Sequence, residues 1–125
     1  MDLQDKRPRL WKSFSYAITG IRTALRTERN MRIHLFVSIV VIGCSVFFSI
    51  SKLEWLFVIA AIGGIFSLEL INTAVERVVD LITEEYHPLA KQAKDLAAGA
   101  VFVYAIMAVV IGVIIFLPYF LRWLI

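Results

Sequence analysis

Residues 55–80 read WLFVIAAIGGIFSLELINTAVERVVD, and the segment changes character along its length. Residues 55–68 carry no charged side chain, and as a helix they rise roughly 21 Å. An apolar helix needs about 20 residues to cross the hydrocarbon of a bilayer. If this segment spans a membrane, Glu69 therefore lies inside the hydrocarbon layer or at its edge. A carboxylate at that depth is costly, and by default it marks a functional site.

The polar side chains that follow residue 68 fall on one face of the predicted helix. At about 100° per residue, the polar positions share one stripe and the apolar positions cover the other side. The stripe consists of Glu69, Asn72, Thr73, Glu76 and Asp80. A single acid paired with a Lys or Arg of a neighbouring helix would serve packing alone, and that alternative stays open for Glu69. It does not account for a row of acidic and amide groups, so the stripe favours a functional site.

The composition of the whole chain places this segment in a membrane. The 125 residues are 60% hydrophobic and the mean hydropathy is +0.80, which excludes an ordinary soluble domain and fits one domain over residues 1–125. The apolar runs predict an all-α integral membrane protein with spans at about 33–51, 55–75 and 96–121, the second continuing as a cytoplasmic helix to about residue 86. The single cysteine, Cys44, excludes an intrachain disulfide framework and a multi-cysteine metal site.

The amino-terminal part of the chain is strongly basic. The first 32 residues carry eight basic and three acidic residues. Apolar residues recur among them at helical spacing, which predicts an amphipathic helix over about residues 7–28, lying on an anionic membrane surface. By the positive-inside rule this end is cytoplasmic, residues 51–54 lie outside, the charged segment 76–95 is cytoplasmic and the carboxyl end lies outside. No nucleic-acid-reading motif accompanies the basic residues, so we expect no nucleic-acid partner.

Acids at a membrane edge, with an amide and a lysine nearby, suit phosphoryl transfer to a lipid alcohol. Mg²⁺ prefers hard oxygen ligands, typically one or two carboxylates completed by waters and substrate phosphates, and Glu28 and Glu76 are suitable ligands. Lys94 would neutralise a polyphosphate, with Asn72 and Asp95 holding its geometry, because such catalysis is mostly positioning and charge stabilisation. The pattern therefore predicts a phosphate-binding site in water beside the membrane.

The acids at positions 69 and 76 lie at different depths along the helix, which suggests a different role for each. They lie about 10 Å apart along the axis, so Glu69 would accept a proton from an alcohol whose body remains in the bilayer. Periodicity indicates a site without proving a kinase, and the six glycines form no Walker A or kinase-type loop. A small proton-coupled transporter also uses a membrane-embedded acid, although its acid is expected near the bilayer midplane. A non-enzymatic membrane adapter would not need Glu69 at all.

Four segments together closely resemble the prokaryotic diacylglycerol kinase family: residues 28–34 (ERNMRIH), 69–80 (ELINTAVERVVD), 85–87 (EYH) and 93–101 (AKDLAAGAV). The similarity extends over essentially the whole chain, including its three spans and its amino-terminal helix. It implies a homotrimeric lipid kinase, embedded in a bacterial cell membrane, that transfers the γ-phosphate of ATP to a lipid alcohol. An oligomer also has a physical reason, because three short helices cannot enclose the polar stripe, but a dimer would satisfy that argument too.

The resemblance also implies roles position by position. Glu69 resembles the proton acceptor, and Glu28 and Glu76 resemble the ligands of Mg²⁺. The implied ATP contacts are Arg9, Tyr16, Glu28, Asn72, Glu76, Asp80, Glu85, Tyr86, His87, Lys94 and Asp95. The implied lipid contacts are Glu69, Asn30, His34 and Ala98, with residues 13–18, 22–25 and 30–34. Asp80 is equally consistent with a solvated helix face, and His87 with the end of a helix before a proline.

Residues 28–34 are more similar to the Gram-positive branch of the family, whose members phosphorylate undecaprenol. Undecaprenol is therefore the expected acceptor, and diacylglycerol is the alternative. Two positions differ from the diacylglycerol-using branch: Ala98 stands where that branch has serine, and His34 stands where it has an acid. Composition and spacing do not distinguish a polyprenol from a glycerolipid.

Overall fold

The computed structural model describes residues 9–125 as four α-helices: α1 (Arg9–Thr27), α2 (Arg29–Phe47), α3 (Lys52–Ile82) and α4 (Pro88–Leu124). Three of them, α2, α3 and α4, are long and apolar enough to cross a membrane. This confirms the expected all-helical architecture with three membrane-length helices. Residues 7–8, the first positions of the range expected for the amino-terminal helix, lie outside the described residues.

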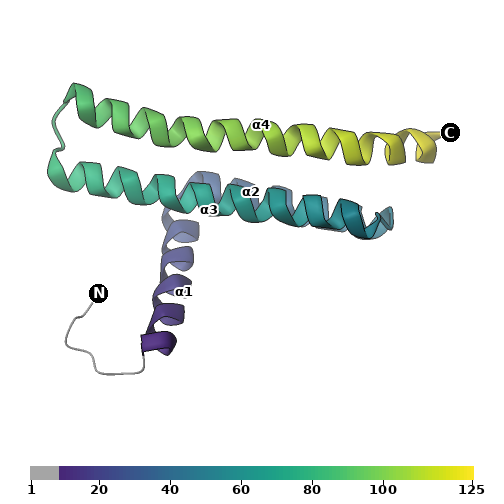
Figure 1. Ribbon diagram of the computed structural model, residues 1–125, viewed down its shortest axis with the longest axis horizontal. Helices are drawn as coiled ribbons and strands as arrows, with labels where there is room; N and C mark the ends of the chain where they lie inside the picture. The colour runs from purple at the N-terminus through teal and green to yellow at the C-terminus, as the bar shows by residue number, and fades with distance from the viewer. Residues whose placement is uncertain (1–8) are drawn as a thin grey trace.

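Helix α3 is the central element of the fold. Figure 1 shows α2, α3 and α4 running alongside one another, while α1 projects from them at a steep angle. Helices α2 and α4 both pack on α3, and α1 contacts α2 and α3. Within residues 9–125 the backbones of α2 and α4 do not approach each other. The polar stripe of α3 therefore lies on the one helix that all the others contact.

Most apolar side chains point away from the other helices, as expected when the surroundings are lipid. Phe36 is 69% exposed and Val103 is 68% exposed, whereas Val58 and Ile65 are buried between helices. Because lipid is as apolar as these side chains, helix association depends on close packing and hydrogen bonds rather than on the hydrophobic effect.

One polar contact fixes α4 against the middle of α3. The Tyr104 hydroxyl donates to the carbonyl oxygen of Ala60 at 2.6 Å, which satisfies a phenol that hydrocarbon would leave without a partner. A Cβ on Gly64 would lie 2.0 Å from the Tyr104 ring. The glycine therefore makes room for the ring against α3.

The turn between α2 and α3 sets where both helices stop and start. Helix α2 ends at Phe47, whereas the first span was expected to extend to about residue 51. Ser49 has a left-handed backbone with φ of 51°, which a right-handed helix cannot include. Ser51 then begins α3: its hydroxyl accepts from the N–H of Glu54 at 3.2 Å, and the Glu54 carboxylate accepts from the N–H of Ser51 at 3.0 Å. This is a capping box.

The connection between α3 and α4 is short and extended. Helix α3 ends at Ile82 rather than at about residue 86, because Thr83 turns to an extended backbone (φ −154°, ψ 135°), although its N–H still donates to the carbonyl oxygen of Val79 at 3.0 Å. Pro88 pushes His87 out of helical geometry, and Nδ1 of His87 accepts from the N–H of Leu89 at 3.1 Å. Helix α4 thus begins well before the apolar run at residue 96, and the charged residues 91–95 are helical.

Candidate functional site

Glu69 is the one acidic residue buried among residues 9–125, with 3% of its surface exposed. It faces α2, where Nε2 of His34 lies 3.2 Å from its Oε1. With a hydrogen on Nε2, the imidazole donates to the carboxylate. A carboxylate in apolar surroundings needs such a partner. The contact directs the acid towards α2 instead of towards open lipid.

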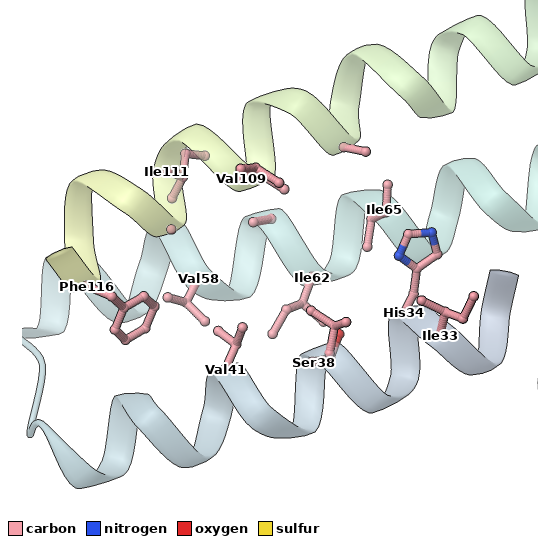
Figure 2. Close-up of a pocket in the computed structure, with 15 residues that line it drawn as sticks. Ile33, His34, Ser38, Val41, Val58, Ile62, Ile65, Val109, Ile111 and Phe116 are labelled. Atoms are coloured by element: carbon pink, nitrogen blue, oxygen red, sulfur yellow. The ribbon is translucent and has the colours of Figure 1, made fainter. Parts of the chain in front are cut away.

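An apolar pocket of about 380 Å³ lies between α2, α3 and α4. Figure 2 shows His34 at one end of this pocket and Phe116 at the other, with aliphatic side chains between them. The labelled aliphatic residues are Ile33, Val41, Val58, Ile62, Ile65, Val109 and Ile111. Because His34 also contacts Glu69, the buried acid adjoins one end of a space suited to a hydrocarbon chain.

The next turn of α3 carries an amide whose oxygen has no partner. Nδ2 of Asn72 donates to Oε1 of Glu76 at 3.4 Å. The buried Oδ1 of Asn72 accepts no hydrogen bond from any residue in the range 9–125. An unsatisfied buried acceptor destabilises a fold by about 1–3 kcal/mol, so its presence beside an acid points to a site that a ligand completes.

Glu28 lies at the corner between α1 and α2. Its backbone is extended (φ −108°, ψ 117°) and its side chain does not cap α2. Instead, Oε1 of Glu28 lies 3.5 Å from Nη2 of Arg77 and 3.5 Å from Oγ1 of Thr27. Arg77 directly follows Glu76, so the fold brings Glu28 to the same turn of α3 as the other predicted Mg²⁺ ligand.

A salt bridge joins the polar ends of α3 and α4. Nζ of Lys94 donates to Oδ1 of Asp80 at 2.6 Å. This hydrogen bond raises the pKa of Lys94 above its ordinary value, and the charge of Glu76 acts in the same direction. Lys94 thus places a cation next to the acidic stripe. Asp95 instead pairs with Lys91 on the exposed side of α4.

Other residues predicted for the site are not gathered around Glu69. Arg9 and Tyr16 lie on α1, whereas the side-chain partner of Glu69 within the described chain is His34 of α2. Asn30 and Ala98 are exposed on α2 and α4. The connection between α3 and α4 holds Glu85, Tyr86 and His87, all exposed, and His87 caps α4. In this single chain the predicted residues thus form several separate groups.

The residues present fit a Mg²⁺ ion held partly by its substrate. Within residues 9–125 no three His, Cys, Asp or Glu side chains form a complete metal cage. Mg²⁺ does not require one, because it commonly takes one or two carboxylates and completes its octahedron with waters and phosphates. Glu28, at the corner between α1 and α2, and Glu76, on α3, would supply such carboxylates, and the unpartnered Oδ1 of Asn72 is a further hard oxygen.

Arg77 is the residue that the sequence interpretation missed. It contacts Thr27 and Glu28 from 50 and 49 positions away. The one sequence signal was an arginine directly after an acid of the polar stripe, on a helix that is otherwise apolar on that side.

These features define a membrane-embedded site where an enclosed acid adjoins an apolar pocket and a half-exposed charged surface. Comparison with known proteins gives the family. The sequence model of prokaryotic diacylglycerol kinases matches residues 15–116. The chain therefore belongs to the prokaryotic diacylglycerol kinase family and is a lipid kinase, which implies ATP as the phosphoryl donor.

Individual relatives differ in the acceptor that their names state. The chain is 50% identical to the undecaprenol kinase of Bacillus subtilis (strain 168), over 94% of this chain and 98% of that protein. It is 43% identical to a diacylglycerol kinase of Synechocystis sp., over 89% of this chain and 64% of that protein. It is 28% identical to the diacylglycerol kinase of Escherichia coli (strain K12), over 90% of this chain and 92% of that protein.

Proposed function

We propose that this protein transfers the γ-phosphate of ATP to undecaprenol, which yields undecaprenyl phosphate and ADP. The single observation that carries the proposal is the buried Glu69, held by His34 at the end of an apolar pocket. The 50% identity to an undecaprenol kinase supports the choice of acceptor. Diacylglycerol is the second candidate, because a relative at 43% identity is named a diacylglycerol kinase. The transporter and adapter alternatives are set aside, since the family consists of lipid kinases.

The pocket and Glu69 act on different parts of the lipid acceptor. The hydrocarbon chain of the acceptor lies in the pocket between α2, α3 and α4, with its hydroxyl at Glu69. Glu69 takes the hydroxyl proton while the hydroxyl oxygen attacks the γ-phosphorus, and the bond to the bridging oxygen breaks as ADP leaves. His34 keeps the carboxylate in place. A positioned general base contributes typically about 10²–10⁴ in rate.

The phosphate end of the site lies nearer to water. Lys94 is a cation at neutral pH, as any exposed lysine is, and its hydrogen bond with Asp80 raises its pKa further, so it serves as a cation for the ATP phosphates. Asn72 and Asp95 hold the geometry of that end. The remaining ATP contacts that we assign on resemblance are Arg9, Tyr16, Asp80, Glu85, Tyr86 and His87. The remaining lipid contacts assigned in this way are Asn30 and Ala98.

We assign Glu28 and Glu76 as the ligands of Mg²⁺. Their support is the contact of Glu28 with Arg77, the residue that follows Glu76 on α3, together with the unpartnered Oδ1 of Asn72. When bound, Mg²⁺ neutralises charge on the β- and γ-phosphates of ATP. The chain itself orients the two carboxylates and keeps their oxygens accessible from water, since the Glu28 side chain is 30% exposed.

We place the protein in a bacterial cell membrane, with the amino end cytoplasmic and the carboxyl end outside. Helix α1 lies on the cytoplasmic surface as an amphipathic helix, which its exposed Leu10, Trp11 and Phe14 support.

We also propose a homotrimer of single-domain chains. A Cβ on Gly63 or Gly99 would meet nothing within 4 Å, so these positions allow a neighbouring helix to approach closely.

The test is a phosphorylation assay on the full chain in detergent micelles, with radiolabelled ATP, Mg²⁺ and equal amounts of undecaprenol and diacylglycerol. The expected product is undecaprenyl phosphate, formed in clear excess over phosphatidic acid. Excess phosphatidic acid establishes the second candidate instead. A protein that phosphorylates neither lipid contradicts the proposal.

A further inference from the structure

Arg77 connects the two parts of the chain to which the Mg²⁺ ligands are assigned. It lies on α3 directly after Glu76, and its Nη2 donates to Oγ1 of Thr27 at 2.9 Å. The same nitrogen lies 3.5 Å from Oε1 of Glu28. Within residues 9–125, Arg77 is the residue of α3 that hydrogen-bonds to Thr27 or Glu28. The corner between α1 and α2 is thus held to α3 by one guanidinium.

Packing alone does not hold this corner tightly. A second cavity, of about 460 Å³, lies between α1 and α3 and is lined by Arg77, by Ile21 and Leu70, and by smaller residues. The small residues are Ala17, Gly20, Ala24 and Ala74. The backbones of α1 and α3 approach each other at far fewer positions than those of α3 and α4, so the polar contacts of Arg77 carry more of the restraint.

The acceptor of the shorter hydrogen bond is itself fixed. Oγ1 of Thr27 donates to the carbonyl oxygen of Thr23 at 2.8 Å, which leaves its lone pairs for Arg77. Glu28 follows directly with an extended backbone and no capping bond from its side chain. Its Oε1 is engaged by Arg77, while its Oε2 accepts no hydrogen bond from residues 9–125. One oxygen of Glu28 is therefore held and the other is free for a cation.

We propose that Arg77 is a positioning residue for the metal site: it holds the corner between α1 and α2 against α3, so that Oε2 of Glu28 reaches the cation bound by Glu76. This inference rests on the proposed function, which assigns the two carboxylates to Mg²⁺. The guanidinium charge opposes a cation, but the Arg77 side chain is 52% exposed, and water and salt screen that repulsion. The loss of a fixed ligand position is the larger effect, because partners that orient metal ligands strongly affect metal affinity.

The test measures Mn²⁺ binding by electron paramagnetic resonance, on the full chain in detergent micelles with a non-hydrolysable ATP analogue. Arg77→Gln should raise the dissociation constant for Mn²⁺ by about tenfold, and Thr27→Val should raise it by less. Arg29→Gln is the matched control, because it removes the same charge next to Glu28, and Arg29 makes no hydrogen bond or ion pair to α3 among the described residues. In the kinase assay, Arg77→Gln should raise the Mg²⁺ concentration needed for half-maximal activity, with kcat at saturating Mg²⁺ largely retained.

Unchanged or tighter Mn²⁺ binding in Arg77→Gln overturns the inference, because the arginine then has no effect on the site or acts as a competitor of the metal. If Arg77→Gln does not elute as a folded protein, Thr27→Val decides in its place, and unchanged binding there has the same meaning. Glu76→Gln separates this result from the proposed function. If Glu76→Gln binds Mn²⁺ as the unaltered chain does, the metal assignment itself is wrong, and the inference with it. If Glu76→Gln loses Mn²⁺ while Arg77→Gln retains it, the inference alone is wrong.

Discussion

The two ends of the three-helix group differ in how completely their polar groups are satisfied. At the aromatic end, defined here by Phe48, Glu54 and Tyr119, the Tyr119 hydroxyl donates to Oε1 of Glu54 at 2.6 Å. Phe48 stacks on the Tyr119 ring with centroids 5.6 Å apart. The hydrogen bond from Tyr119 lowers the pKa of Glu54, and the backbone N–H of Ser51 acts in the same direction. Oε1 of Glu54 therefore accepts two hydrogen bonds from within the chain, from Tyr119 and from Ser51.

The acidic end, defined here by Glu76, Asp80 and Lys94, is less complete. Oδ1 of Asn72 has no hydrogen-bond partner within the described residues. The salt bridge between Lys94 and Asp80 is about half exposed, with 40% and 55% of the two side chains accessible. A pair of this kind contributes at most about 1 kcal/mol of stability, so it does not explain why the charges gather there.

This difference indicates that the polar groups of the aromatic end stabilise the fold, whereas those of the acidic end are available to bind a ligand. Natural folds leave polar groups unsatisfied or charges clustered mainly at functional sites, where a ligand completes them. Glu69 has features of both ends. It is buried and has a hydrogen-bond partner within the chain, but through His34 it also adjoins the apolar pocket. If the two ends are independent, a change at one end should leave the properties of the other end unaltered.

The largest effect is expected for Glu69→Gln. The amide keeps the size of the side chain and a hydrogen bond with His34 but accepts no proton, so kcat should fall about 10³-fold without loss of fold. The measurement is the phosphorylation assay, with the melting temperature as a test of folding. Glu84→Gln, in the exposed connection between α3 and α4, is the matched control and should retain full activity. Near-normal turnover by Glu69→Gln would remove this acid from the chemistry.

A smaller loss is expected when the partner of the acid is changed. His34→Ala leaves Glu69 buried without a hydrogen bond, and activity should fall about tenfold, because a positioning group is lost while the base remains. His34→Gln retains a donor and should recover part of the loss. The assay compares both variants at saturating undecaprenol. If His34→Ala and His34→Gln are equally impaired, a hydrogen bond to Glu69 is not the function of this side chain.

Local rules predicted the parts of this structure that depend on neighbouring residues. Apolar runs and a helical period gave three membrane-length helices and singled out Glu69, because both signals reside within one segment. The pairing of Glu69 with His34 depends on how α2 packs on α3, across 35 positions, and no pattern in either helix encodes it. Arg77 was missed for the same reason. Helix α2 ends earlier than expected because Ser49 has a left-handed backbone, and a serine in the sequence does not predict that conformation.

The roles assigned to the site remain predictions from resemblance. The structure brings Glu28 to the turn of α3 next to Glu76 and joins Lys94 to Asp80, and neither result follows from spacing. Arg9 lies on α1, and the backbone of α1 does not approach that of α4 within the described residues. The sequence therefore predicted which residue types would carry the chemistry, whereas the way they assemble depends on tertiary packing.

The contact midway between the two ends gives the next test. Gly64→Ala would place a Cβ 2.0 Å from the Tyr104 ring, so the ring must leave α3 and lose its hydrogen bond with Ala60. The free energy of unfolding should fall by about 1–3 kcal/mol, measured by denaturation in mixed micelles. Gly43→Ala is the matched control, because a Cβ there meets nothing within 4 Å. An equally stable Gly64→Ala would mean that Tyr104 does not fasten α4 to α3.

The smallest effect is expected for Tyr119→Phe at the aromatic end, where the ring stack remains and one hydrogen bond is lost. Because the bond lowers the pKa of Glu54 below its ordinary 4.5, its stabilising effect is present above that pH and disappears as the pH falls through the lowered value. The melting temperature of Tyr119→Phe should therefore lie a few degrees below that of the unaltered chain at neutral pH, and the two should converge in acid. Kinase activity should not change, since this end holds no residue of the proposed site. A difference that persists undiminished in acid would assign the loss to packing instead of to the carboxylate, and a parallel loss of activity would show that the two ends are coupled.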